Sequence, residues 1–272
     1  MALTLATWNI NSVRLRIGLV GRFLEEAQPD VLCLQETKCR DSEFPAADFH
    51  RFGYPHVAIN GQKGYHGVAI VSKLPFAQID KREFCAKGDA RHLGVTFAPG
   101  IAGPDALSVH NFYVPAGGDE PDPESNPKFA HKLAFLDEMT AWMRSHNLAA
   151  GHAILVGDLN IAPLEHDVWS HKALASVVSH TAVEIARLNQ VQDSGPWIDA
   201  MRARVAHSEK LYTWWSYRSP DWAAANKGRR LDHVWLSTSL APSLADMVVH
   251  AHVRSWDKPS DHVPVMVRLD PQ

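Results

Sequence analysis

Three carboxylates in this sequence stand at or inside short apolar runs, where they could take part in the hydrolysis of a phosphate ester. Glu36 follows Val-Leu-Cys-Leu-Gln, Asp158 follows Ile-Leu-Val-Gly, and Asp232 lies within Leu-Asp-His-Val-Trp. A carboxylate in a buried strand is costly unless it is paired or bound to a metal ion. Glu36 is therefore a candidate ligand for a hard metal ion, although a strand-end salt bridge with Lys38 explains it equally well. Asp158 is a candidate for the group that orients or deprotonates an attacking water molecule.

Asparagine side chains accompany these acids at alternate positions, a spacing that points two side chains to one side of a strand end. Asn9 and Asn11 follow the first apolar run, and Asn160 lies two residues beyond Asp158. An amide oxygen can ligate Mg²⁺, and an amide N–H₂ group can bind a phosphate oxygen. A structural alternative for the first pair is that Asn11 or Ser12 caps the helix that follows.

Three further groups suit the same chemistry. Tyr113 stands at the end of an apolar run before Val-Pro-Ala-Gly-Gly, where its phenol could donate a hydrogen bond to a developing oxyanion, although most such tyrosines are packing residues. Asp261 and His262 open the last apolar run and offer a metal contact and an imidazole for phosphate binding or acid–base catalysis. Asp232 needs a partner, and Arg230, two residues away on the same face, is one candidate.

The donor atoms in this set are almost all oxygens. The sequence has no cysteine or histidine pairs at the spacing of a zinc site around these positions. Carboxylate and amide donors favour Mg²⁺ or Mn²⁺ over Zn²⁺. Phosphate ester hydrolysis is the reaction class that such ligands serve best.

Short apolar runs must position these side chains, and seven of them have the length and composition of strands. The predicted strands are Leu3–Trp8, Val31–Leu34, Val68–Val71, Leu107–Tyr113, Ala153–Val156, Leu231–Leu236 and Val263–Leu269. The candidate site residues lie at or near the ends of these strands. In a layered sheet protein such ends gather at one edge, so we expect the candidate residues to meet there.

Helical segments separate the strands. Val13–Ala27 and Lys132–Asn147 carry apolar residues at helical spacing, and the first of them stops before a proline. Thr181–Glu184 matches a capping box that opens a helix, and Pro196 suits the first turn of a helix over Pro196–Val205. Strands dominate and do not follow a regular βαβ period, which favours an α/β or α+β layered sandwich.

Length and composition are those of an ordinary globular chain, with 272 residues, 46% hydrophobic and 21% charged. Similar chemistry lies on both sides of Pro115–Pro127, so we expect a surface loop there and a single domain over residues 1–272. The N-terminus lacks the pattern of a signal peptide, and no apolar run approaches the ~20 residues that span a bilayer. These features predict a cytoplasmic protein with no membrane partner.

The overall charge argues mildly against nucleic acid as a partner. The net charge is −3 and the pI is about 6.6, whereas dedicated nucleic-acid binders often carry a basic surplus. Basic residues nevertheless flank the candidate clusters locally. They are Arg14, Arg16, Lys38, Arg40, Arg218, Lys227, Arg229 and Arg230.

Six motifs in the order WNIN, LQETK, YVP, GDLNIAP, RLDHVW and SDHVPV span residues 8–265. Together they resemble the exonuclease III family of apurinic/apyrimidinic (AP) endonucleases, within the DNase I-like superfamily. The resemblance implies a four-layer α/β (α+β) sandwich of two packed mixed β-sheets flanked by helices. It also implies 3′→5′ exonuclease action, incision at AP sites and removal of 3′-blocking groups. The implied substrate is double-stranded DNA with abasic sites or 3′-ends, the implied cofactor is Mg²⁺ with Mn²⁺ as a substitute, and we expect a monomer.

Carried over by motif, the resemblance gives each position a role. The implied metal ligands are Asn9, Glu36, Asp158, Asn160, Asp261 and His262. The implied catalytic residues are Tyr113, Asp158, Asn160, Asp232 and His262, with Asp232 as the group that orients His262. The implied DNA contacts are Asn11, Lys38, Trp214, Trp215, Arg218 and Arg229. The two tryptophans would form an apolar pocket for an extruded abasic sugar, although packing in the core explains at least one of them.

Two features depart from the family's pattern. Ala116 stands where the family commonly has an Asn or Gln that contacts phosphate, and Asp119–Glu124 would repel DNA unless it points away. One alternative is a phosphoesterase of the same superfamily that acts on inositol phosphates or phospholipids. A second alternative is a catalytically inactive homologue that binds DNA or RNA. The QETK, Trp-Trp and RLDHVW segments favour DNA, and the presence of every acidic and histidine position favours an enzyme.

Overall fold

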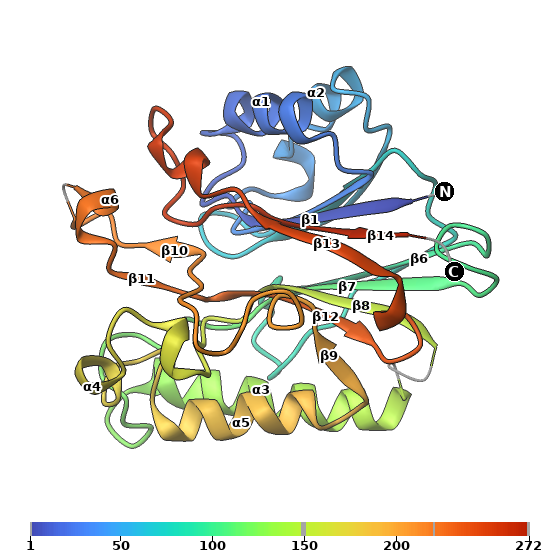
Figure 1. Ribbon diagram of the computed structural model, residues 1–272. Helices are drawn as coiled ribbons and strands as arrows, with labels where there is room; N and C mark the ends of the chain where they lie inside the picture. Colours follow the sequence, from blue (N-terminus) through green and yellow to red (C-terminus); the bar gives the residue numbers. More distant parts are fainter. Residues whose placement is uncertain (1, 148–150, 220, 271–272) are drawn as a thin grey trace.

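Two six-stranded sheets pack face to face in the computed structural model, which describes residues 2–147, 151–219 and 221–270 (Figure 1). The first sheet has the order β13-β14-β1-β2-β4-β3. Its strands are β1 Leu3–Asn9, β2 Val31–Gln35, β3 His56–Asn60, β4 Val68–Ser72, β13 Leu244–Val249 and β14 Val265–Leu269. The second sheet has the order β5-β6-β7-β8-β12-β9. Its strands are β5 Gln78–Asp80, β6 His92–Phe97, β7 Leu107–Tyr113, β8 His152–Asp158, β9 Trp197–Asp199 and β12 Asp232–Ser237.

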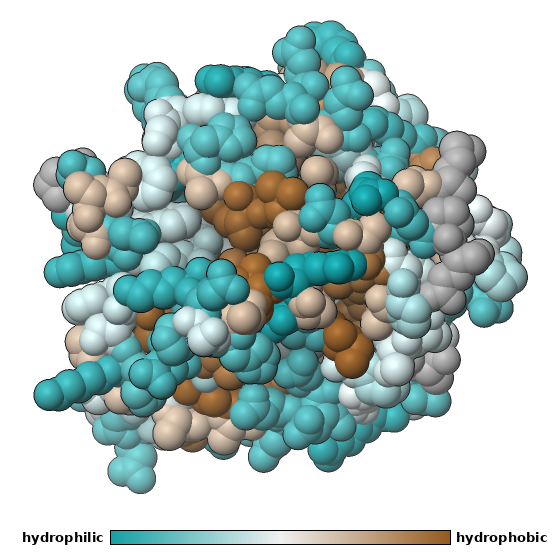
Figure 2. Space-filling view, viewed as in Figure 1, coloured by the Kyte–Doolittle hydropathy of each residue, from teal (hydrophilic) through white to brown (hydrophobic). Residues whose placement is uncertain are grey.

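Helices cover the outer face of each sheet. The helices α1 (Ile17–Ala27) and α2 (Ala46–Arg51) lie over the first sheet, whereas α3 (Pro127–His146) and α5 (Ala182–Gln192) lie over the second (Figure 1). The surface over these outer helices is largely hydrophilic, and hydrophobic residues show between the two layers (Figure 2). This arrangement confirms the predicted four-layer sandwich.

Smaller elements gather at one end of the sandwich (Figure 1). They are α4 His171–Leu174, α6 Trp222–Ala225 and the two-stranded ribbon of β10 Trp214–Trp215 and β11 Gly228–Arg229. Short 3₁₀ helices occur at Asp41–Glu43, Glu165–Asp167, Ala241–Ser243 and Ala251–Ser255. In the part of the chain that the structure describes, no helix is long and apolar enough to cross a membrane.

Strand direction brings the predicted site residues to one end of the sandwich. The pairs β1–β2 and β7–β8 are parallel, so their carboxyl ends coincide. The strands β14 and β12 run antiparallel beside β1 and β8, so they begin where those strands finish. As a result Tyr113 pairs with Asp158, which pairs in turn with Asp232. At the opposite end, Leu3 pairs with Leu269.

Apolar side chains fill the space between the sheets, as the alternation along each strand requires. Leu5 and Val156 belong to this central layer, whereas Trp8 points the other way and packs against Phe23 of α1. Polar side chains are exceptional in this layer. Asn111 donates to the carbonyl oxygens of Leu34 and Ala69, both at 3.0 Å, and its own oxygen accepts from Gln35 at 2.7 Å. This bonding ties β7 of the second sheet to β2 and β4 of the first.

All seven predicted strands exist, with ends that differ by up to two residues. The predicted helix over Val13–Ala27 begins only at Ile17, because the preceding residues form a turn. Asn11 and Ser12 do not cap it, since their φ angles are 48° and 85° and Arg16 occupies the N-cap position. The helix predicted over Lys132–Asn147 starts earlier, at Pro127.

The helix predicted over Pro196–Val205 is wrong. Trp197–Asp199 forms β9 and pairs with β12, and only turns follow it. Pairing with an existing sheet edge has overridden the local signal of a proline at the start of a helix. In contrast, the capping box at Thr181–Glu184 is confirmed, because Thr181 accepts from the Glu184 amide and the Glu184 carboxylate accepts from the Thr181 amide.

The spacing in the sequence suggested Arg230 as a partner of Asp232, but Arg230 binds other carboxylates. Its guanidinium binds both oxygens of Asp167 at 2.8 Å and Asp199 at 2.6 Å. Arg202 also binds Asp167, at 2.5 Å, and Asp167 and Arg230 are fully buried. Burial alone would raise the pKa of Asp167, but the two guanidinium groups hold it below its ordinary value of 3.8.

Replacement of Asp167 tests this buried charge cluster. We expect Asp167→Asn to lower the free energy of unfolding by about 3–5 kcal/mol at pH 7, because two buried guanidinium groups lose their shared carboxylate. Denaturant unfolding measures the difference. Asp270→Asn, which breaks the exposed pair with Arg268, is the control and should cost no more than about 0.5 kcal/mol.

The difference in free energy of unfolding between wild type and Asp167→Asn should become smaller at low pH. Because the pKa of Asp167 is depressed in the folded state, its contribution is complete above the ordinary carboxyl pKa and is lost as the pH falls through the folded value. The gap between wild type and Asp167→Asn should therefore shrink below about pH 4. A gap that stays constant down to pH 2 would contradict the electrostatic origin of the stability.

Candidate active site

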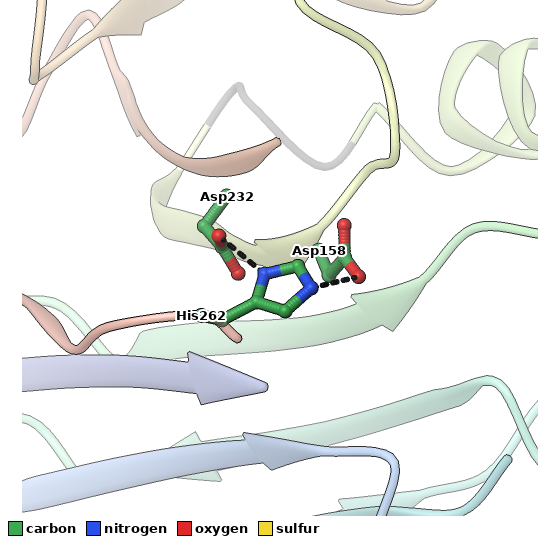
Figure 3. A group of neighbouring side chains, drawn as sticks. All are labelled: Asp158, Asp232 and His262. Carbon is green, nitrogen blue, oxygen red and sulfur yellow. Dashed lines mark hydrogen bonds and ion pairs between the residues drawn. The ribbon is translucent and has the colours of Figure 1, made fainter. Parts of the chain in front are cut away.

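Three buried ionisable side chains lie together where the two sheets meet. The Nδ1 atom of His262 is 2.8 Å from Asp232 Oδ2, and its Nε2 atom is 3.6 Å from Asp158 Oδ2 (Figure 3). Asp158 ends β8, Asp232 begins β12, and His262 precedes β14, so two sheets contribute to one group. Within the described residues, this is the group in which three acidic or histidine ligand atoms lie within 4.8 Å of one another.

The charges of this group are mutually dependent. Burial raises the pKa of Asp158 to about 7, and the Asp232 carboxylate raises it as well, against the opposing effect of His262. Burial alone would lower the pKa of His262, but Asp232 and Asp158 raise it to about 10. His262 is therefore an imidazolium at neutral pH, and Asp158 can exchange a proton near neutrality.

A second set of contacts surrounds Glu36. The Asn9 N–H₂ group donates to Glu36 Oε1 at 2.9 Å and to Asp158 Oδ2 at 2.8 Å. The Tyr113 hydroxyl also donates to Glu36 Oε1, at 2.8 Å. Burial raises the pKa of Tyr113 well above 10, with the Glu36 and Asp158 carboxylates adding to the effect. The phenol therefore stays protonated and remains a hydrogen-bond donor.

Asn160 closes the group on the other side of Asp158. Its backbone N–H donates to Asp158 Oδ1 at 2.9 Å, and its side-chain N–H₂ donates to Asp158 Oδ2 at 3.2 Å. Its φ angle of 55° lies in the left-handed region that asparagine tolerates better than most residues. The fully buried Lys132 donates to the Asn160 carbonyl at 2.8 Å and is paired with Glu184. This lysine supports the backbone turn from beneath.

Lys38 marks a place that suits a cation. Its ammonium lies 2.8 Å from Glu36 Oε2 and 2.5 Å from Asn11 Oδ1, and Asn11 in turn donates to Asp261 Oδ1 at 3.2 Å. Burial alone would raise the pKa of Glu36, but Lys38 and Asn9 lower it overall, so this carboxylate stays ionised. Oxygens of Glu36, Asn11 and Asp261 are the donors that a hard divalent cation prefers.

These contacts favour a cation site at Glu36, Asn11 and Asp261, which shares only Glu36 and Asp261 with the ligand set that the resemblance implies. Asn9 presents its N–H₂ group to the two carboxylates, and its oxygen accepts from the Asn11 amide at 3.1 Å. Both ring nitrogens of His262 face carboxylates, and an imidazolium must lose a proton before it can bind a metal. The oxygens around Lys38 are thus the better cation site than the Asp158–Asp232–His262 group.

An open cavity of about 790 Å³ lies over these residues, and we call it the strand-end cavity. Predicted residues line it as follows: Glu36, Tyr113, Asp158, Asn160, Trp214, Arg218, Arg229, Asp261 and His262. Asn9, Asn11, Lys38 and Asp232 contact this lining from behind or beside it. A groove of about 690 Å³ beside α1 contains none of the predicted residues, so we place the chemistry in the strand-end cavity.

The two neighbouring tryptophans face different ways. Trp214 lines the strand-end cavity, with the Arg229 guanidinium 5.3 Å from its ring. Trp215 is buried, packs against Tyr212 and Trp222, and donates from its indole to Asn226 at 3.0 Å. Of the two tryptophans expected at a pocket, Trp214 therefore faces the strand-end cavity, and Trp215 belongs to the core of the ribbon.

Several cavity residues were not identified from the sequence. Trp169, Ser179 and Leu231 line the cavity as well, and so does Lys227, which the sequence placed only among the basic residues near the clusters. Trp169 had no distinguishing local context, and Ser179 is recognisable only because it accepts from Arg229 at 2.7 Å. Lys132 did carry a signal, since it stands among apolar positions of a helix where an unpaired charge would be costly.

Part of the acidic stretch Asp119–Glu124 lies at the strand-end cavity, and part of it points away. Asp119 lines the strand-end cavity. Asp122 is turned into its own loop, where it accepts from the Glu124 amide and the Ser125 hydroxyl. At the position that departs from the family, the Ala116 carbonyl accepts from Lys132 at 3.2 Å.

A family model for the endonuclease/exonuclease/phosphatase family matches residues 6–262. The chain belongs to this family. Exodeoxyribonuclease III of Haemophilus influenzae is 28% identical over 268 residues, which cover 95% of this chain and 97% of that protein. These similarities confirm the resemblance inferred from the six motifs.

Two solved structures agree closely with the fold. An AP endonuclease from Archaeoglobus fulgidus superposes with a TM-score of 0.89 and 30% identity, covering 98% of this chain and 99% of that one. A 3′ phosphatase from Neisseria bound to a product DNA hairpin gives the same TM-score, identity and coverage. Both similarities extend over the whole of the described sandwich.

The imidazolium character of His262 can be tested without a metal ion. We expect Asp232→Asn to lower the pKa of His262 by about one to three pH units, because the closest compensating carboxylate is lost. Histidine NMR titration in EDTA measures it, with the signal assigned from a His262→Gln spectrum. Asp246→Asn on the exposed edge strand β13 is the control, and an unchanged pKa in Asp232→Asn would refute the pairing.

Proposed function

We propose that this chain is a DNA-repair phosphodiesterase of the exonuclease III type. It would remove nucleotides in the 3′→5′ direction from duplex DNA, incise at AP sites and clean blocked 3′-ends. The observation that carries this proposal is the joint placement of two differently tuned carboxylates, Asp158 and Glu36, beneath one open cavity with a cationic and aromatic wall. The relatives named exodeoxyribonuclease III and AP endonuclease support DNA as the substrate.

Asp158 is the proposed base. With a pKa of about 7 it can orient a water molecule and take its proton as the oxygen attacks phosphorus in line with the leaving group. Asn160 and Asn9 hold this carboxylate from two sides, so its lone pairs have a defined direction. The phosphoryl centre would lie in the cavity between Asp158 and the opposite wall.

His262 and Tyr113 are the proposed stabilisers of the developing charge. His262 is held as an imidazolium by Asp232 and would neutralise the phosphoryl oxygens. Tyr113 keeps its proton and can donate a hydrogen bond to the phosphate or to the leaving 3′-oxygen. Asn160 would add an amide donor to the phosphate if its N–H₂ group turned from the Asp158 carboxylate, to which it donates at 3.2 Å.

Mg²⁺, with Mn²⁺ as a substitute, is the proposed cofactor. Glu36, Asn11 and Asp261 would hold it at the place that the Lys38 ammonium marks. Bound there, a divalent cation would supply Lewis-acid stabilisation of charge on the phosphate and on the leaving oxygen. Lys38 would then be released to contact a neighbouring phosphate.

The cavity wall supports a nucleic-acid substrate despite the net charge of −3. Arg218, Lys227 and Arg229 contribute positive charge to it, and Trp214 contributes an aromatic face for an extruded sugar or base. We propose that the chain acts as a monomer and as one domain over residues 1–272. The alternatives that act on inositol phosphates or phospholipids are not favoured, because the similar proteins named above are DNA enzymes.

Cleavage of a duplex oligonucleotide with one abasic analogue tests the function. We expect cleavage with Mg²⁺ or Mn²⁺ and none with EDTA, and we expect Asp158→Ala to reduce the rate by a factor on the order of 10³ or more. Gel electrophoresis of the labelled strand measures both.

Asp137→Ala on the outer face of α3 is the matched control and should cleave like wild type. If purified wild-type protein leaves the duplex intact in both metals, the AP-site assignment is wrong. Release of inorganic phosphate from inositol polyphosphates by the same protein would favour the other superfamily activity.

Arg218 tests the DNA-facing wall. It is exposed at the mouth of the cavity, so we expect Arg218→Ala to weaken duplex binding and to reduce the slope of log K against log salt by about 0.9. Fluorescence anisotropy at several salt concentrations measures the slope. Arg268→Ala, at the opposite end of β14, should leave it unchanged.

A further inference from the structure

Backbone pairing fastens the ribbon to the segment that carries Asp261 and His262. The Trp215 amide donates to the Asp261 carbonyl at 2.9 Å, and the Val263 amide donates to the Thr213 carbonyl at 2.9 Å. Trp214 consequently lies directly opposite His262 in an antiparallel bridge. The register of this bridge fixes where the Trp214 side chain can reach.

The Trp214 indole reaches the carboxylate of Asp261. Its Nε1–H group donates to Asp261 Oδ2 at 2.9 Å, while Asn11 donates to the other oxygen, Oδ1, at 3.2 Å. Each oxygen of this carboxylate is thus held by one donor. Arg229 lies 5.3 Å from the Trp214 ring centroid and restrains it further.

A second contact restrains the same loop. The Tyr217 hydroxyl donates to the Pro259 carbonyl at 2.8 Å and accepts from Arg16 at 3.0 Å. Trp214 and Tyr217, which follows β10, therefore contact the segment before β14 at two points, Asp261 and Pro259. These contacts help to hold the Asp261 carboxylate in place.

We propose that Trp214 is a positioning residue for Asp261 and that its indole N–H group orients this carboxylate toward the cation site. The proposal rests on the metal site assigned under the proposed function. A donor to the second oxygen of a ligating carboxylate fixes the direction of the first, and removal of such partners typically costs 10–100-fold in metal affinity. Trp214 then serves both the wall of the strand-end cavity and the cation site.

A purely stacking role for Trp214 makes a different prediction. Trp214→Phe keeps an aromatic face toward the cavity but has no N–H group to donate. If the tryptophan only receives the substrate, the free protein should bind a cation as well as wild type does. If it positions Asp261, cation binding should weaken even when no DNA is present.

Mn²⁺ binding to the DNA-free protein separates the two roles. We expect the dissociation constant, measured by titration of the free Mn²⁺ EPR signal, to rise about 10-fold or more in Trp214→Phe. Trp215→Phe is the matched control, since its indole donates to Asn226 and lies outside the cavity, and its Mn²⁺ affinity should equal that of wild type. Equal affinity in Trp214→Phe and wild type would overturn the proposal.

A metal-free measurement tests the contact itself. The nine tryptophans give nine indole N–H signals in a ¹H–¹⁵N spectrum, and the Trp214→Phe spectrum identifies that of Trp214. We expect Asp261→Asn to move the Trp214 signal upfield and to leave that of Trp215 in place. A Trp214 signal that does not respond would overturn the proposal whether or not Mn²⁺ binding is measurable.

These outcomes differ from a failure of the proposed function. A wild-type protein that binds Mn²⁺ but leaves abasic duplex intact would refute the function and leave the Trp214 contact standing. A protein that cleaves the duplex while Trp214→Phe binds Mn²⁺ normally would refute the positioning role alone.

Discussion

Two carboxylates that face each other across β8 and β12 determine how the candidate site is built. Asp158 and Asp232 are register partners, and both are buried. Like charges directly opposite each other in neighbouring strands destabilise a sheet, and burial adds to that cost. His262 lies against both as an imidazolium. The second sheet tolerates this pair because a residue next to the first sheet supplies the opposite charge, so electrostatics as well as apolar packing join the sheets here.

That compensation depends on the last strand. The Trp8 indole donates to the His262 carbonyl at 3.1 Å, and the Ser260 hydroxyl donates to the Asn9 carbonyl at 2.6 Å. Both bonds link the first strand to the final segment of the chain, so the charge balance is complete only when β14 has docked beside β1. The same arrangement gives the carboxylates different proton affinities. Glu36 stays ionised beside Lys38, whereas burial moves the pKa of Asp158 toward neutrality, and this separation would suit one carboxylate to a cation and the other to a proton.

The sequence predicts seven of the twelve strands described in the two sheets, because a buried strand and the polar group that ends it are both local signals. It gives no prediction for β3, β5, β6 and β13, and it predicts a helix where β9 lies. It predicts much less about partners. The spacing of Arg230 suggested Asp232, whereas Asp167 and Asp199, distant in sequence, bind it. Pro196 suggested the start of a helix, and the local sequence gives no sign that the following residues pair with β12. Trp214 and Trp215 are adjacent residues of the same type, and only the register of the ribbon decides which one faces the cavity. The proposed cation position likewise depends on a contact between Lys38 and Asn11 that the spacing of residues in the sequence does not predict.

The pairing of Leu3 with Leu269 also has a practical consequence for attaching the protein to other molecules. Both of these positions lie at the end of the first sheet opposite Asn9 and Val265, a separation of about 20 Å for a strand of this length. Both side chains are buried, so a label, surface anchor or second module would have to be joined through the backbone at these two strand ends. Two modules joined there would lie beside each other and would face away from the strand-end cavity. Immobilisation through this end should therefore present the strand-end cavity outward, as single-molecule observation of a nuclease on tethered DNA requires.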